Sequence, residues 1–144
     1  MSNTDATTPD TKAHLLATGY QLIAKKGFTA VGLKQILDTA GVPKGSFYHY
    51  FASKEAFGEA IINHYFSLYK TRLDVIDAQD VSAQQKLYDY FQNWYDTQQN
   101  GCDHEKCLVV KLSAEVADMS ETMRKALDTG YQQTTMWLAK QIKA

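Results

Sequence analysis

Short groups of apolar residues recur at helical spacing along most of the chain. The pattern is tightest over residues 33–40, where the apolar positions are Leu33, Ile36, Leu37 and Ala40. This period of 3.6 residues predicts a short amphipathic helix. Gly41 would end it, because glycine tolerates the positive φ of many helix C-termini. Pro43 suits the first turn of a second helix, where its missing N–H would be unpaired in any case.

The second helix is predicted to be very short. Phe47 and Phe51 are four residues apart, so both can face a core. The other side chains are predicted to face outward: Lys44, Ser46, Tyr48, His49 and Tyr50. Two short helices joined by a tight turn that contains glycine, the second exposing polar and aromatic side chains, form a helix-turn-helix.

Helical patterns also flank this motif. A first helix would begin at Thr8-Pro9 and end at Gly27, with an apolar face formed by Leu15, Leu16, Tyr20, Leu22 and Ile23. Ser53 has the features of the N-cap of a long helix. The face of that helix would run through Phe57, Ile61, Tyr65, Leu68 and Arg72 toward Ile76. The long helix would connect a three-helix head to a body.

The second half of the chain is predicted to be helical too. Residues 77–82 are polar and indicate a linker. Residues 81–99 form a helix with a wide apolar stripe of Leu87, Tyr90, Phe91, Trp94 and Tyr95. Residues 107–119 favour helix, and residues 120–143 form the last one. The predicted fold class is therefore all-α, with about seven helices, a head at 10–53 and a body at 54–144.

Composition agrees with this assignment. The chain has only two prolines and no runs of alternating β-branched residues, which favours an all-helical protein. No apolar run approaches the ~20 residues of a membrane span, so we expect no membrane partner. Residues 1–9 are rich in Ser, Thr and Asp without the basic start and apolar block of a signal peptide. We therefore predict a disordered lead and a cytoplasmic location.

The net charge of −1 hides an uneven distribution. Residues 1–54 carry six lysines against three aspartates, a net charge of +3, whereas the rest carries nine basic against thirteen acidic residues, a net charge of −4. A basic first third on an acidic body is typical of a head that faces DNA and a body that does not. A chance fluctuation in surface charge could also produce this split.

The motif also resembles a known family, the TetR-type transcriptional repressors. The matching residues are Gly41-Val42, Lys44-Gly45-Ser46-Phe47-Tyr48, Tyr50-Phe51 and Ser53-Lys54-Glu55, with Gly27-Phe28-Thr29 upstream. The resemblance covers about residues 11–65. It implies a regulator that represses transcription through double-stranded DNA, and we accordingly expect neither an enzyme nor a cofactor.

The resemblance places Lys44, Gly45 and Ser46 at the end of the helix that enters the major groove. Lys44 has the reach to donate to guanine N7 and O6. Tyr48 and Lys54 resemble the phosphate contacts of the family. The complete set of predicted DNA contacts is Thr29, Gly32, Lys34, Lys44, Gly45, Ser46, Tyr48, His49, Tyr50 and Lys54.

Gly32 departs from the family pattern, which usually has Ser or Thr there to cap the helix and touch a phosphate. Glycine still caps at a cost of only a few tenths of a kcal/mol, but it brings no hydroxyl to the phosphate. The family also pairs two subunits through further helices, so we expect a homodimer and a palindromic operator with half-sites ~34–36 Å apart or a multiple of that. The chain ends at Ala144, which we interpret as inside the body.

Two cysteines, Cys102 and Cys107, suggest a sensor in the body. Both should be reduced in a cytoplasmic protein. Cys107 has Lys106 beside it and lies close to His104 and Lys111, all of which favour a thiolate that electrophiles or oxidants could modify. The segment from Cys107 to Val116 also resembles the TetR subgroup that represses N-ethylmaleimide-reductase-type genes and responds to reactive electrophiles.

Other interpretations stay open for the body and the head. Cys107 could be a small buried hydrophobe. It could form a metal site with Cys102 and His104, or act with His104 as the nucleophile of an enzyme, although no oxyanion motif or cofactor loop accompanies them. The head could bind a partner other than DNA. A small-molecule pocket could be lined by Trp94, Tyr95, Met119 and Met123, although such a stripe is also typical of a core.

Overall fold

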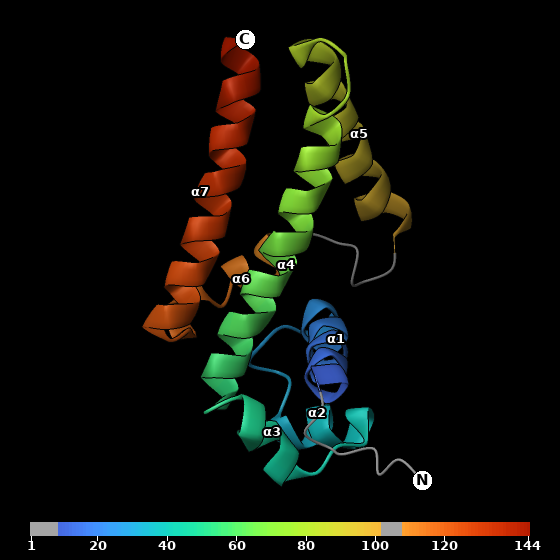
Figure 1. The fold of residues 1–144 in the computed structure, drawn as a ribbon. Helices are drawn as coiled ribbons and strands as arrows, with labels where there is room; N and C mark the ends of the chain where they lie inside the picture. The colour runs from blue at the N-terminus through green and yellow to red at the C-terminus, as the bar shows by residue number, and fades with distance from the viewer. Residues whose placement is uncertain (1–8, 102–107) are drawn as a thin grey trace, which may run out of the picture.

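The computed structural model describes residues 9–101 and 108–144 of the chain. Its helices are α1 (Pro9–Lys26), α2 (Leu33–Ala40), α3 (Lys44–Tyr50), α4 (Lys54–Asp77), α5 (Ala83–Asn100), α6 (Leu108–Ser113) and α7 (Glu121–Lys143) (Figure 1). A short 3₁₀ turn, η2 (Val116–Asp118), lies between α6 and α7. The described residues contain no strand, which confirms the predicted all-α class.

The helix ends follow local sequence signals. Gly27 and Gly41 follow α1 and α2 with φ of 87° and 68°, the left-handed conformation that glycine adopts at low cost. Ser53 caps α4, and its Oγ accepts a hydrogen bond from the Ala56 N–H at 3.0 Å. Ser82 and Ser120 cap α5 and α7 in the same way. The predicted helix ends at Gly27, Gly41 and Ser53 are confirmed.

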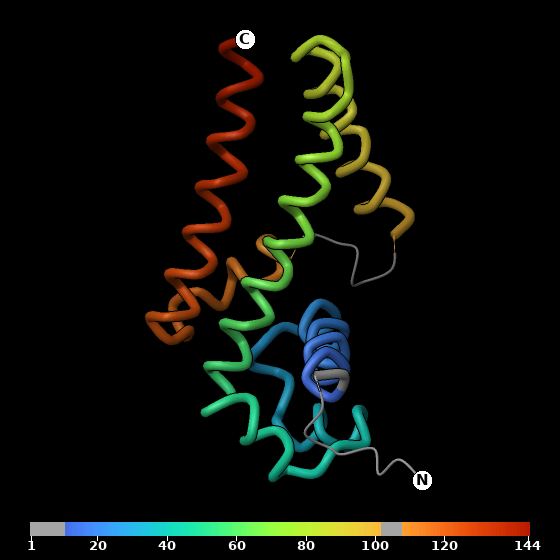
Figure 2. Tube along the Cα trace, viewed as in Figure 1, coloured from blue at the N-terminus to red at the C-terminus, as the bar shows by residue number. Residues whose placement is uncertain are grey.

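Helix α4 packs against α1, α5 and α7. Helix α7 runs alongside it, α5 lies on its other side, and α1 packs against its first half (Figures 1 and 2). Helices α2 and α3 lie at the end of the molecule opposite the C-terminus. One hydrophobic cluster, which includes Leu15, Phe47, Phe57, Leu112 and Leu127, continues from the helix-turn-helix into the body.

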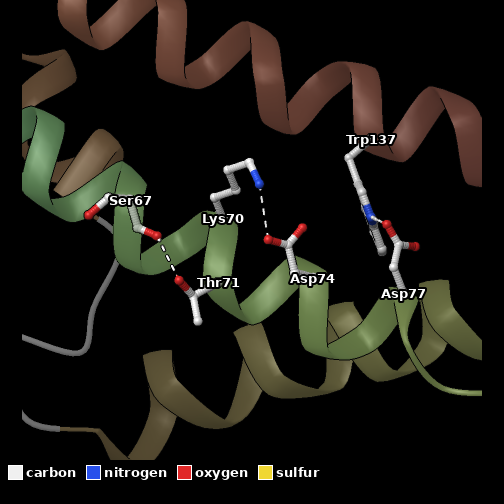
Figure 3. Close-up of polar contacts among 6 residues, drawn as sticks. All are labelled: Ser67, Lys70, Thr71, Asp74, Asp77 and Trp137. Atoms are coloured by element: carbon white, nitrogen blue, oxygen red, sulfur yellow. Dashed lines mark hydrogen bonds and ion pairs between the residues drawn. The ribbon is translucent and has the colours of Figure 1, made fainter.

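The far end of α4 is fixed to two other helices by one carboxylate. The Trp137 Nε1–H on α7 donates to Asp77 Oδ2 at 2.9 Å, as Figure 3 shows, and Gln141 Nε2 donates to Oδ1 at 3.3 Å. Lys86 on α5 lies 3.7 Å from the same carboxylate. Asp77 is therefore the last residue of α4 and an anchor, not part of a linker as the sequence indicated.

The structure also corrects three other expectations. Leu68 is exposed, and the buried face of α4 continues through Leu73 instead. Helix α5 begins at Ala83, two residues later than predicted, and none of its residues is buried. Within residues 108–119, α6 ends at Ser113 and a 3₁₀ turn follows, so this segment is not one helix. Among the described helices, none is both long and apolar enough to span a membrane.

Candidate nucleic-acid interface

The turn between α2 and α3 is closed by backbone hydrogen bonds. Gly41, at φ 68°, follows α2, and its N–H bonds back to the Leu37 carbonyl. The Val42 N–H donates to the same carbonyl at 3.1 Å. Pro43 is the N-cap of α3, one residue before its first helical position. This tight turn directs α3 away from α2 and leaves the first turn of α3 at the end of the molecule.

Helix α3 divides into an inward and an outward half, each made of two rows with i, i+4 spacing. Phe47 and Phe51 are 0% and 5% exposed and belong to the core, as predicted. The outward half consists of the rows Lys44–Tyr48 and Gly45–His49, and all four of these residues are exposed. The helix therefore presents a basic and aromatic face to solvent.

Ser46 and Tyr50 form the second inward row, which the sequence did not predict. Ser46 is 8% exposed, so the expectation that it faces outward is wrong. Tyr50 is half-buried and packs against the core cluster. The packing of α3 within the head therefore buries a wider surface of this helix than the single Phe47–Phe51 row.

The outward face is partly organised before any ligand arrives. The Lys44 Nζ lies 6.0 Å from the centroid of the Tyr48 ring, within the range of a cation–π contact. The Tyr48 ring packs edge-on against buried Phe47 at 5.4 Å between centroids. The contact with Phe47 therefore holds the Tyr48 ring in position, although Tyr48 is 47% exposed. No added Cβ at Gly45 would meet any atom within 4 Å, so the backbone there is open to close approach.

Lys54 is the first residue of α4 and lies half-buried beside this face. Its Nζ is 4.5 Å from the centroid of the Phe28 ring, a close cation–π contact. Lys54 lies in the first turn of α4, where a helix N-terminus favours a negatively charged group. Lys54 is therefore held in place by an aromatic ring from the turn after α1.

Thr29 is bound to a carboxylate of the body. Its hydroxyl donates to Glu115 Oε1 at 2.5 Å, and its backbone N–H donates to the same oxygen at 2.8 Å. Both of its donors are thus taken by a carboxylate, whose charge would repel a phosphate. Thr29 would have to leave Glu115 before it could donate to a phosphate, and the DNA contact at Thr29 stays a prediction.

The weaker candidates on α2 are both exposed. Lys34 pairs with Asp38 at 2.8 Å, which raises the pKa of the lysine through the hydrogen bond and the charge of Asp38. A fully exposed pair of this kind exchanges readily for another anion. Gly32 is the N-cap of α2, without a side-chain bond, as its lack of a hydroxyl requires.

One contact in the head escaped the sequence analysis. The Nε2 of His14 on α1 lies 2.8 Å from the Ala40 carbonyl at the end of α2. Because a carbonyl only accepts, the imidazole is the donor, and it satisfies a helix C-terminal oxygen that has no partner within α2. This bond joins residues 26 positions apart, and no local pattern could have indicated it.

The predicted ligand pocket does not form as a unit. Met119 and Met123 are 4% and 1% exposed and lie in the core cluster. Trp94 instead lines a cavity of about 30 Å³ between α4 and α5, large enough only for water, and together with Tyr95 it lines an open groove of about 520 Å³ along α5. Tyr95 is exposed. The four residues are divided between a buried core and an outer helix face.

The sensor residues Cys102 and Cys107 lie outside the described residues, as does His104. The sensor, metal and nucleophile hypotheses at these positions therefore stay predictions. Helix α6 starts at Leu108, directly after Cys107 in the sequence.

The head and its outward face define the helix-turn-helix class. Residues 15–61 match the family model described as "Bacterial regulatory proteins, tetR family". The chain is 48% identical over 125 residues to the HTH-type transcriptional repressor NemR of Escherichia coli K12, covering 84% of this chain and 61% of that protein. It is 33% identical over 117 residues to the repressor DhaR of a Mycobacterium species, covering 81% of this chain and 57% of that protein.

Solved structures give the same result. The crystal structure of the reduced form of E. coli NemR superposes with a TM-score of 0.86 at 43% identity, covering 93% of this chain and 70% of that one. The regulatory protein TetR from Rhodobacter sphaeroides superposes with a TM-score of 0.82 at 28% identity, with coverages of 92% and 70%. The chain belongs to the TetR family. It spans about three fifths of the length of the curated relatives it matches.

Proposed function

We propose that this chain represses transcription by binding a specific DNA sequence through α3 and the start of α4. The observation that carries the proposal is the outward half of α3, where Lys44, Tyr48 and His49 are exposed opposite a buried aromatic row. The first turn of such a short helix fits the major groove. Lys44 would read a base edge, while Tyr48 and Lys54 would bind phosphates. Gly45 would let the backbone approach.

Two relatives support this assignment by their printed names, since NemR and DhaR are both HTH-type transcriptional repressors. Ser46 is omitted from the proposed contacts because it is buried. Thr29 is omitted because it is bonded to Glu115. Lys34 is retained as an outer phosphate contact. The remaining DNA face consists of lysines and aromatic side chains around one helix end.

The test is a salt titration of DNA binding. The protein is used to enrich a duplex from a random-sequence pool, and its affinity for that duplex is measured from low to high salt. Counterion release predicts that the logarithm of the association constant falls linearly and steeply with the logarithm of the salt concentration. The proposal would be contradicted if the protein bound the duplex with no dependence on salt, or if it enriched no sequence from the pool.

A matched pair of tyrosine variants locates the interface. Tyr48→Ala should weaken DNA binding about tenfold, because a hydrogen bond to a charged phosphate is lost. Tyr88→Ala removes another exposed tyrosine, from α5 and away from the head, and should leave the affinity unchanged. Equal effects of the two variants would place the interface elsewhere.

We further propose that modification of Cys107 releases the DNA. A thiolate at this position would add to the double bond of N-ethylmaleimide: a C–S bond forms, and the neighbouring carbon takes a proton from water. The adduct would displace α6, which begins one residue later. After treatment with N-ethylmaleimide, the wild type should release the operator duplex, whereas Cys107→Ser should stay bound to it. Cys102→Ser is the matched control variant. Normal release by Cys107→Ser would exclude this trigger.

A small molecule is the other candidate effector. A groove of about 280 Å³ between α4 and α7 is lined by Phe66, Tyr69, Leu73, Gly130, Thr134 and Trp137, with Lys70 and Asp74 at its edge. An apolar lining with a few polar groups suits a small ligand. Lys70 and Asp74 are paired at 3.0 Å (Figure 3), so an entering ligand would meet a neutral pair.

A further inference from the structure

One carboxylate of the body binds the turn that follows α1. Glu115 lies between α6 and η2, and it accepts three hydrogen bonds from this turn. The Phe28 N–H donates to Oε2 at 2.9 Å, and the N–H and hydroxyl of Thr29 donate to Oε1 at 2.8 and 2.5 Å. The two segments are 86 and 87 positions apart in the sequence. This contact therefore connects head and body directly.

The turn is shaped for this carboxylate. Gly27 has φ of 87°, which orients the next two backbone N–H groups toward the same point. A Cβ at Gly27 would come within 2.7 Å of Glu115 Oε2. A side chain at this position would therefore strain the backbone and also push the carboxylate away. The site requires glycine for two independent reasons.

The contact reaches the DNA face through one aromatic ring. The residue whose N–H binds Glu115 is Phe28, and the Phe28 ring lies under the Lys54 Nζ at 4.5 Å. The ring is itself fixed from below, because it fills the space over Gly58 together with Met123. Displacing the Phe28 backbone would therefore move the ring that supports Lys54.

We propose that Glu115 is a positioning residue for DNA binding: it fixes the turn after α1, and through Phe28 it holds Lys54 at the phosphate. The proposal rests on the proposed function at Lys54. It also assigns a physical path between α6 and the head, since Glu115 follows α6 by two residues. A displacement of α6 would pull the carboxylate from its three donors.

Simple electrostatics gives the opposite expectation, which makes the idea testable. Removing a negative charge near DNA should strengthen binding and increase its salt dependence. If Glu115 positions Lys54, Glu115→Ala should instead weaken binding about tenfold and lower the salt slope by about one, as loss of one phosphate contact would. Whether Glu115→Ala strengthens or weakens DNA binding therefore distinguishes the electrostatic expectation from the positioning role.

The first measurement needs no DNA. Amide hydrogen exchange is followed in the wild type, Glu115→Ala and Glu121→Ala, the last of which removes an exposed carboxylate from α7. The Phe28 and Thr29 amides should exchange about tenfold faster in Glu115→Ala alone, because their acceptor is gone. Equal exchange in all three proteins would overturn the contact itself, whatever the protein does with DNA.

The second measurement is a double-mutant cycle on the duplex enriched by the wild type. Glu115→Ala, Lys54→Ala and the double variant are compared across salt concentrations. If Glu115 acts through Lys54, the double variant should bind no more weakly than Lys54→Ala alone. Additive losses would overturn this path. Unchanged or tighter binding by Glu115→Ala with freed amides would overturn the positioning role while leaving DNA binding intact.

A milder variant covers the case in which Glu115→Ala folds poorly. Thr29→Val removes one of the three donors and keeps both backbone bonds, and Thr29→Ser keeps all three. Thr29→Val should lower the salt slope in the same direction as Glu115→Ala, and Thr29→Ser should restore it. Identical behaviour of Thr29→Val and Thr29→Ser would overturn the proposal. If the wild type binds no DNA, the positioning role fails with the proposed function, and amide exchange alone then reports on the contact.

Discussion

At the scale of single residues, the outward face of α3 predicts two kinds of effect on DNA binding. Lys44 is exposed at the first helical position and is the proposed base contact. Lys44→Ala should relax base preference at one position of each half-site, at a cost of ~1–3 kcal/mol on the preferred sequence. Affinities for a set of duplexes, each changed at one position, would measure this.

The matched control is Lys140→Ala, an exposed lysine in the last turn of α7. It should lower neither affinity nor preference. An equal loss for Lys44→Ala on the operator and on random DNA would assign Lys44 to a phosphate instead.

Glu115 also makes a prediction about pH. Partial burial by itself raises the pKa of its carboxyl, but the hydrogen bonds from Thr29 and Phe28 and the charge of Lys111 outweigh this and lower the pKa below its usual range. A carboxyl whose pKa is lowered in the folded state stabilises the protein above the unfolded pKa, and this stabilisation is lost as the pH falls through the folded pKa. Urea unfolding of wild type and Glu115→Gln should differ at neutral pH; the difference should begin to shrink as the pH falls through about 4.3 and close only below the lowered pKa of the folded state.

A stability difference that stays constant from pH 7 to pH 3 would contradict this assignment. Glu121→Gln supplies the control, since it changes an exposed carboxylate by the same charge.

Single residues also show where sequence reasoning stopped. Phe47 and Phe51 were placed inward from their spacing alone, and both are buried. The same spacing leaves Ser46 on the outward side, yet Ser46 is buried because the head covers two rows of α3 rather than one. Glu115 has no local signature, because its partners are more than eighty residues away. Tertiary contacts of this kind cannot be read from periodicity.

At the scale of secondary structure, the sequence predicted best where a helix has both a clear period and clear ends. Helix α2 has the predicted bounds, because its apolar stripe lies between two glycines, Gly32 and Gly41. Helix α6 ends earlier than predicted because residues 108–119 contain no glycine or proline that would mark a stop in the sequence. The chain turns after Ser113, and this turn brings Glu115 to its partners in the head. The end of α6 is therefore determined by tertiary packing.

The N-cap of α2 offers a stabilising change. Gly32 has ordinary β-region dihedrals, and a Cβ there would meet no atom within 4 Å. Gly32→Ser should therefore add a capping hydrogen bond and raise the free energy of unfolding by a few tenths of a kcal/mol. Denaturant titration of Gly32→Ser beside Gly32→Ala would measure it.

Gly32→Ala lacks the hydroxyl and should be less stable than Gly32→Ser. If alanine stabilises as much as serine, the gain would come from restricting the unfolded chain and not from the cap.

At the scale of the whole molecule, the sequence is basic over residues 1–54 and acidic over the rest, and the helix-turn-helix lies at the end of the molecule opposite the C-terminus (Figure 1). This polarity orients the head toward a duplex during approach. We predict that two copies bind one palindromic operator, with half-sites ~34–36 Å apart or a multiple of that. Native mass spectrometry of the complex and footprinting of the enriched duplex would check the copy number and the symmetry. One copy on an asymmetric site would contradict the prediction.

The anchor at Asp77 has a practical consequence for spectroscopy. The chain has two tryptophans. Trp137 is 9% exposed, with its indole N–H bonded to Asp77, whereas Trp94 is 40% exposed on α5. Their fluorescence should therefore separate into a shielded component and one that acrylamide quenches freely. Separation of α7 from α4 would make Trp137 accessible to acrylamide. The fluorescence of Trp137 therefore reports on the contact between these two helices.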